Sequence, residues 1–138
     1  MLLALQLLNL LADPGAPADT TPDQFTFTDQ TGVARSSTIT SVAITVSGIN
    51  SGATITVSGG SYDINASDSF TTDPGTVNNG DTVRARHTSS ASYSGVTNTV
   101  ITIGGVSDTF SSTTLPDPNV KGGTCSAFPW AILSRRRH

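Results

Sequence analysis

The segment 78–90 (NNGDTVRARHTSS) constrains the fold of this chain more than any other. Its apolar positions, Val83 and Ala85, fall on one face of an extended strand. The intervening and following arginines, Arg84 and Arg86, fall on the other face. The glycine before this run suits a tight turn, because glycine accepts a positive φ without steric cost. A strand with one apolar and one charged face is half-buried, so this segment predicts the middle of a β-sheet.

Similar short runs lie on both sides of this strand. They occupy residues 25–27, 42–46, 53–57, 62–64, 96–103 and 106–110. In the runs 42–46 and 53–57, a slip of one residue would turn every apolar side chain toward solvent, so their register is strongly specified. Turn residues separate the runs at intervals of about 8–12 residues. The pattern predicts an all-β domain over residues 19–115, an immunoglobulin-like β-sandwich of about seven to nine antiparallel strands.

The composition fits such a domain and argues against one class of partner. The chain has no Glu and a single Lys, and 12% of its residues are charged. Thr and Ser take the place of surface charges, which suits solvent-facing strands. Residues 19–117 carry nine Asp against three Arg, hence a net charge of −6. Such a body lacks the clustered cations that phosphate contacts need, so no nucleic-acid binding is expected.

Residues 1–18 are expected to form an apolar arm and a linker. The run 1–12 (MLLALQLLNLLA) is shorter than the roughly 20 residues that cross a membrane, so no span is expected. One interpretation is a secretory signal, since Ala16-Pro17-Ala18 resembles a cleavage site, although no Lys or Arg precedes the run. The favoured interpretation is a short helix or arm that is buried against a partner. This predicted assembly anchor comprises Leu2, Leu3, Leu5, Leu7, Leu8, Leu10 and Leu11.

Residues 116–138 are expected to form a flexible C-terminal tail. The sequence PDPNVKGG at its start disfavours regular structure. An apolar cluster around Trp130 follows, ahead of the basic residues 135–137, and it either folds back on the sandwich or docks elsewhere. Trp130 is therefore a candidate surface contact. The one cysteine, Cys125, lies outside the predicted sandwich, so the fold cannot depend on an internal disulfide.

Two groups of residues invite a chemical interpretation that the sequence does not favour. His87 could act as a base, with Asp81 or Asp108 behind it, for one of the nearby serines Ser89, Ser90, Ser92 and Ser94. Nothing resembles a nucleophile elbow, so a structural histidine at a strand end is predicted. The aspartates Asp63, Asp68, Asp73 and Asp81 are too widely spaced for a calcium loop and are predicted to form turns. No catalytic, metal or cofactor site is predicted.

Arg84 and Arg86 are the candidates for surface contact within the body. They would meet a sugar carboxylate or a neighbouring subunit, or else pair with aspartates across the sheet. Tyr62, Tyr93 and Trp130 are too sparse to predict a sugar-stacking platform.

Five segments of the body resemble a bacterial immunoglobulin-like repeat of secreted surface proteins and tailed-phage virion proteins. They are DTTPDQFTFTDQTGVA, TVSGI, TVSGGSYDIN, GTVNNGDTVRARHTSSASYS and TNTVITIGGVSDTFSSTT, in this order between residues 19 and 114. The resemblance implies a non-enzymatic spacer or display module and carries no defined binding residues. Residues 1–18 and 119–138 lie outside it. A single copy, in place of a tandem array, favours a small protein attached to a larger assembly.

These observations predict a structural protein of a virion, either a capsid decoration or a tail component. Its partners would be other capsid or tail proteins, reached through the termini. The alternative is a secreted adhesin module at the bacterial cell surface that binds host glycans or cells. No enzymatic activity is expected, since no acid and base converge in the sequence.

Overall fold

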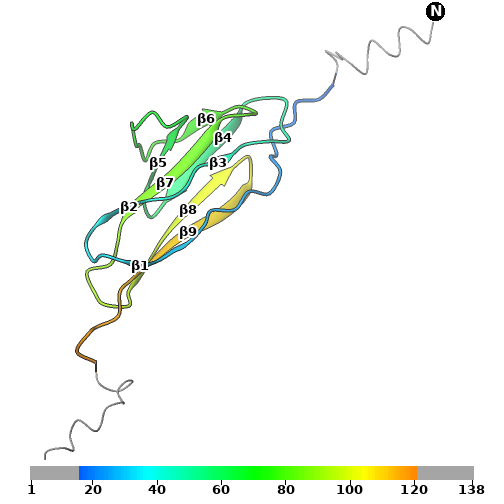
Figure 1. Cartoon of the computed structure of the whole chain (residues 1–138). Helices are drawn as coiled ribbons and strands as arrows, with labels where there is room; N and C mark the ends of the chain where they lie inside the picture. The colour runs from blue at the N-terminus through cyan, green and yellow to red at the C-terminus, as the bar shows by residue number, and fades with distance from the viewer. Residues whose placement is uncertain (1–15, 121–138) are drawn as a thin grey trace, which may run out of the picture.

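The computed structural model describes residues 16–120, which form nine β-strands and no helix. The strands are β1 (Gln30–Val33), β2 (Thr38–Thr40), β3 (Ile44–Thr45), β4 (Ala53–Ser58), β5 (Ser61–Ile64), β6 (Gly75–Val77), β7 (Thr82–Thr88), β8 (Val96–Ile103) and β9 (Val106–Thr114). One sheet has the order β1-β9-β8-β4-β6, and the other gathers β2, β3 and β5 around β7. The two sheets face each other as the layers of a sandwich (Figure 1). The all-β prediction is confirmed.

The strand β7 lies in the centre of the four-stranded sheet. It pairs with β2 and β3 along one edge and with β5 along the other, always antiparallel. Val83 and Ala85 are fully buried, while Arg84 and Arg86 lie on the outer face and are partly exposed. The alternation in this segment therefore predicted both its central position and its orientation.

In the five-stranded sheet, β8 and β9 form a long hairpin. The register pairs Ile103 with Val106, which leaves Gly104 and Gly105 as a two-residue turn. Both glycines have positive φ, 54° and 90°, as the tight turns that match the twist of a hairpin require. The hairpin carries Ile101, Ile103 and Phe110 into the core.

Both sheets and the segment before β1 contribute to one apolar core. Phe25 and Phe27 are buried in it, although their segment forms no strand. The Phe27 N–H donates to Asp108 Oδ2 at 2.7 Å, so the segment is held by a side chain instead of a ladder. The buried apolar residues are Phe25, Phe27, Ile39, Val46, Ile49, Ala53, Ile55, Tyr62, Val77, Val83, Ala85, Ile101, Ile103 and Phe110.

Two details of the predicted sandwich were wrong. The strands are not all antiparallel, because β1 pairs with β9 in parallel, with Gln30 opposite Ser112. The run 42–46 is not one continuous strand, and Val42 is 67% exposed. Thr40 pairs with Arg86 but Ile44 pairs with Val83, so one extra residue is inserted between β2 and β3. Such a bulge reverses which side chains face the core, and it turns Val42 outward.

Several predictions concern residues outside the described range. The N-terminal helix or arm with its leucine anchor, and Trp130 in the tail, fall there. In the part of the chain that is described, no helix is long and apolar enough to span a membrane.

Candidate functional site

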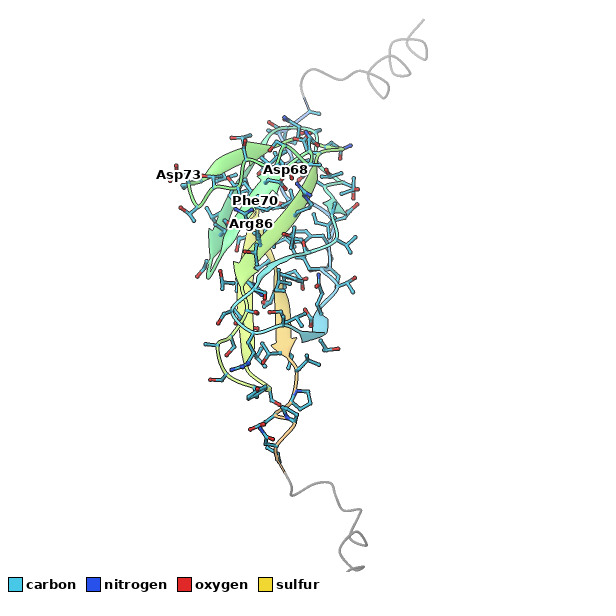
Figure 2. The ribbon with its side chains drawn as sticks, turned by 60° about the vertical axis from the view of Figure 1, so that its left-hand side comes forward. Asp68, Phe70, Asp73 and Arg86 are labelled. Atoms are coloured by element: carbon cyan, nitrogen blue, oxygen red, sulfur yellow. The ribbon has the colours of Figure 1, made fainter. Side chains whose placement is uncertain are left out.

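The outer face of the four-stranded sheet carries the charged cluster of the body. Arg84 and Arg86 project from β7, opposite Asp63 and Ser61 of β5 in the strand register. The chain after β5 returns alongside it, where Tyr62 and Thr71 exchange two backbone hydrogen bonds. This return brings Asp68 and Phe70 onto the face of the two arginines (Figure 2).

Arg84 pairs with two carboxylates. Its Nε donates to Asp63 Oδ1 at 3.0 Å, and its Nη2 donates to the second oxygen of Asp63. The same Nη2 lies 2.6 Å from Asp68 Oδ1. The side chain of Asp63 is completely buried, whereas that of Asp68 is 81% exposed. The prediction that an arginine here pairs with aspartates across the sheet is confirmed for Arg84.

The ion pair determines how Asp63 ionises. Burial by itself would raise the pKa of Asp63. The hydrogen bonds from Arg84 and from the Asp68 N–H, together with the charges of Arg84 and Arg86, outweigh that effect and hold the pKa below its usual value of 3.8. The bonds to Asp63 and Asp68 raise the pKa of Arg84 further above its already high ordinary value. Both groups are therefore charged at neutral pH.

The loop that supplies Asp68 is held in a strained conformation. Asn65, Ala66 and Asp68 all have positive φ, between 54° and 61°. For a side chain with a Cβ this region is costly, most clearly for Ala66, which has no polar group to compensate. Asn65 fastens the loop to the sheet, since its amide donates to Asp81 Oδ1 and its oxygen accepts from the Thr82 N–H, each at 3.0 Å.

Arg86 is bound differently from Arg84. Its guanidinium carbon lies 3.7 Å from the centre of the Phe70 ring, so the group stacks on the aromatic face. Arg84 lies farther from the same ring, at 5.3 Å. Within residues 16–120, Arg86 has no carboxylate partner at salt-bridge distance. Phe70 thus holds one guanidinium whose N–H donors are not taken by an anion.

A hollow of about 460 Å³ opens beside Arg86. The residues that line it are Thr38, Gly59, Gly60, Ser61, Thr72, Arg86, His87 and Thr88, and of these the ring of His87 is turned into the core. No aliphatic side chain contributes to this lining. The hollow and the stacked arginine together form the candidate functional site.

Two glycines at the edge of this hollow pack closely against neighbouring strands. Gly59 has a φ of +82°, and a Cβ there would lie 2.5 Å from the Asn98 carbonyl oxygen. A Cβ on Gly60 would lie 2.5 Å from the Arg86 carbonyl oxygen and 2.4 Å from Thr99 Oγ1. Any side chain at either position would push the turn between β4 and β5 away from its neighbours, so the sequence Gly-Gly is required by close backbone approach.

His87 is the last but one residue of β7, and its ring is buried between the sheets. It bridges the two sheets, with Nδ1 2.7 Å from Thr99 Oγ1 and Nε2 2.7 Å from Ser112 Oγ. Its ring also stacks on Phe110, with the ring centres 5.0 Å apart. Its side-chain hydrogen bonds go to these core hydroxyls, and not to any of the serines suggested by the sequence.

The tyrosines considered as sugar-stacking residues lie outside the hollow. Tyr62 is buried and donates to the Asp73 carbonyl oxygen at 2.8 Å, so it presents no face to a sugar. Tyr93 lies in the loop between β7 and β8, where the Arg35 guanidinium carbon is 3.9 Å from the centre of its ring. Among residues 16–120 no three His, Cys, Asp or Glu side chains converge as a metal site would require.

Sequence reasoning missed the role of Asp63 and Phe70. Asp63 was assigned to a turn, yet it lies in β5, because the alternation of the SYDI segment is short and both Tyr62 and Asp63 are buried. Asp63 stands directly opposite Arg84 in the register of β5 and β7, and this pairing between distant segments left no local signal in the sequence. Phe70 stands in a polar loop, and no local pattern identified its partner.

No family model matches this chain, and no curated protein or solved structure matches it significantly.

Proposed function

We propose that this chain is a non-enzymatic structural module with an immunoglobulin-like fold, displayed on a larger assembly and attached to it through its termini. One observation carries the proposal. Residues 19–115 close their own apolar core, and the chain leaves this body at two opposite ends, near residues 16 and 120 (Figure 1). A body of this form is suited to standing between, or projecting from, other components.

The order of the strands supports the immunoglobulin-like part of the proposal. In such folds, strands B, E and D share one sheet and strands C, F and G the other. Here β2–β3, β7 and β5 would correspond to B, E and D, and β4, β8 and β9 to C, F and G. The first segment supports the same assignment, since the Asp23 N–H donates to the Ser47 carbonyl oxygen beside β3 before β1 joins β9 in the other sheet.

The sequence of the termini favours a virion, as capsid decoration or tail component, among larger assemblies. The seven leucines of the anchor would give a short arm a larger apolar surface than is usually exposed to water. We therefore expect a protein surface to cover them. The tail adds Trp130 and a basic end that would complement an acidic partner. Capsid and tail proteins are therefore the proposed partners.

Deletion of residues 1–12 tests this proposal. The shortened chain should remain folded, with an unchanged thermal unfolding midpoint, and should no longer sediment with large particles from the producing cells. A length-matched variant, Leu5→Gln with Leu8→Gln, should behave like the deletion, and Gln6→Ser with Asn9→Ser should behave like the wild type. Normal incorporation of the deleted chain would refute the anchoring role.

The second candidate, a secreted adhesin module that binds glycans, is favoured by the polar hollow beside Arg86. N-terminal sequencing of natural material separates the two functions. A mature chain that starts at Asp19 would support export, whereas a chain that retains residues 1–12 would support assembly.

A further inference from the structure

We propose that the hollow beside Arg86 binds the carboxylate of an acidic sugar, such as a uronic acid or a sialic acid. This inference names a ligand class for the glycan-binding candidate, and it does not depend on the proposed structural function, because it concerns the outer face of the body and not the termini.

The two arginines of β7 differ in their partners. Arg84 directs its Nε and Nη2 donors to Asp63 and Asp68, so two carboxylates already pair with its charge. Arg86 is oriented by stacking on Phe70 instead, and stacking uses the face of the guanidinium while leaving the N–H groups at its edge available. A planar fork of donors matches a carboxylate in a two-bond arrangement.

The residues that line the hollow are mostly polar. The hydroxyl-bearing residues Thr38, Ser61, Thr72 and Thr88 line the hollow together with the arginine, and the glycine turn completes it. The lining includes no aliphatic side chain that could pack against the side chain of a peptide or the tail of a lipid. Its volume of about 460 Å³ falls in the range of roughly 300–1,000 Å³ typical of small-ligand sites. A ligand that is polar throughout and carries one acid group fits best.

The site is also held in place before any ligand arrives. Arg86 and Thr88 belong to the central strand of the sheet, and Thr38 is paired directly with Thr88. The Ser61 hydroxyl points to the Arg86 carbonyl oxygen at 3.5 Å. A preorganised site loses less conformational entropy when the ligand binds.

Local charge restricts the ligand to a single anionic group. Arg84 and Arg86 together balance Asp63 and Asp68, so the cluster as a whole is neutral. The surrounding body has a net charge of −6 and would repel a polyanion. Attraction therefore arises at short range from Arg86, which predicts weak binding, with a dissociation constant of about 1 mM.

Titration of the full-length, ¹⁵N-labelled chain with sugars, followed by amide chemical shifts, tests the proposal. The probes are glucuronate, N-acetylneuraminate, glucose, acetate and inorganic phosphate, each to about 20 mM. The two acidic sugars should shift the amides of Gly60, Ser61, Thr72 and Thr88 and should bind about tenfold more tightly than glucose, acetate or phosphate. Equal binding of glucose would overturn carboxylate recognition. Equal binding of acetate or phosphate would show that the hollow binds anions without selecting a sugar, which would refute the proposal. The absence of any response to either acidic sugar would refute it as well.

Variants identify the residue responsible. Arg86→Gln should weaken acidic-sugar binding about tenfold, and Arg86→Lys should weaken it severalfold, because lysine keeps the charge but loses the planar fork. Arg35→Gln is the matched control, since Arg35 also stacks on an aromatic ring but lies outside the hollow. An equal loss in Arg35→Gln would refute the assignment. All three variants should join the assembly normally, so this proposal and the structural function can fail separately.

Discussion

The buried histidine between the sheets should make this fold sensitive to mild acid. The Thr99 hydroxyl donates to the Gly59 carbonyl oxygen at 3.1 Å, so its oxygen is free to accept from His87 Nδ1–H. Nε2 then accepts from the Ser112 hydroxyl. The neutral imidazole thus satisfies both of its nitrogens, whereas protonation would place a charge between the sheets and require the Ser112 hydroxyl to turn and accept from Nε2–H. Lowering the pH from about 7.5 to about 5 should therefore destabilise the wild type more than His87→Gln.

The size of the effect follows from the pKa. Burial lowers the pKa of His87 below its ordinary value of 6.5, so the unfolded chain takes up a proton before the folded chain does. The stability that neutral His87 contributes is complete above pH 6.5 and is lost as pH falls from 6.5 toward the lower folded pKa. One proton changes the free energy of unfolding by at most about 1.4 kcal/mol per pH unit. Between pH 6.5 and 5 the loss is thus at most about 2 kcal/mol.

Urea denaturation across this pH range measures the effect. His87→Gln keeps a donor and an acceptor but does not titrate, so its free energy of unfolding should vary less with pH than that of the wild type. The second histidine, His138, is common to both proteins and cancels in the comparison. Asp63 and Asp81 have lowered pKa values and titrate below this window. Parallel pH profiles for the two proteins would refute the reasoning.

Three further predictions concern stability. Ile101→Ala should lower the free energy of unfolding by about 2–5 kcal/mol in urea, because Ile101 is fully buried, whereas Val42→Ala should change it by less than about 0.5 kcal/mol. Ala66→Gly should raise it by roughly 0.5 kcal/mol, since relief of the positive φ exceeds the entropy cost of glycine; a loss of stability would contradict the strain. Asp63→Asn should lower the thermal unfolding midpoint more than Asp68→Asn at pH 7. This difference between the two variants should disappear in acid. The ionised Asp63 carboxylate stabilises the fold, and that stabilisation is lost as pH falls below 3.8 and through the lower pKa of Asp63 in the folded chain.

Much of the fold could be predicted from alternation alone. Ala53 and Ile55 are buried in β4, and Val83 and Ala85 are buried in β7, as a period of two requires. Alternation could not reveal the bulge that exposes Val42, because an inserted residue is a property of two paired strands and not of one. The parallel pairing of β1 depends likewise on a partner some 80 positions away in the sequence.

Only part of the candidate site could be predicted from the sequence. The outward direction of Arg84 and Arg86 followed from the strand pattern. Their different roles did not, because these depend on which loop returns across the sheet and brings Asp68 to one arginine and Phe70 to the other. Long-range packing of an irregular loop leaves no periodic trace in the sequence.

The parallel pairing of β1 with β9 has a mechanical consequence. The two strands run in the same direction, and the chain reaches β1 from the end of the body opposite to the one where β9 departs (Figure 1). Tension between residues 16 and 120 would therefore drag β1 along β9, loading their hydrogen bonds together in shear instead of peeling them apart one at a time. A module built in this way should unfold under stretching only at comparatively high force.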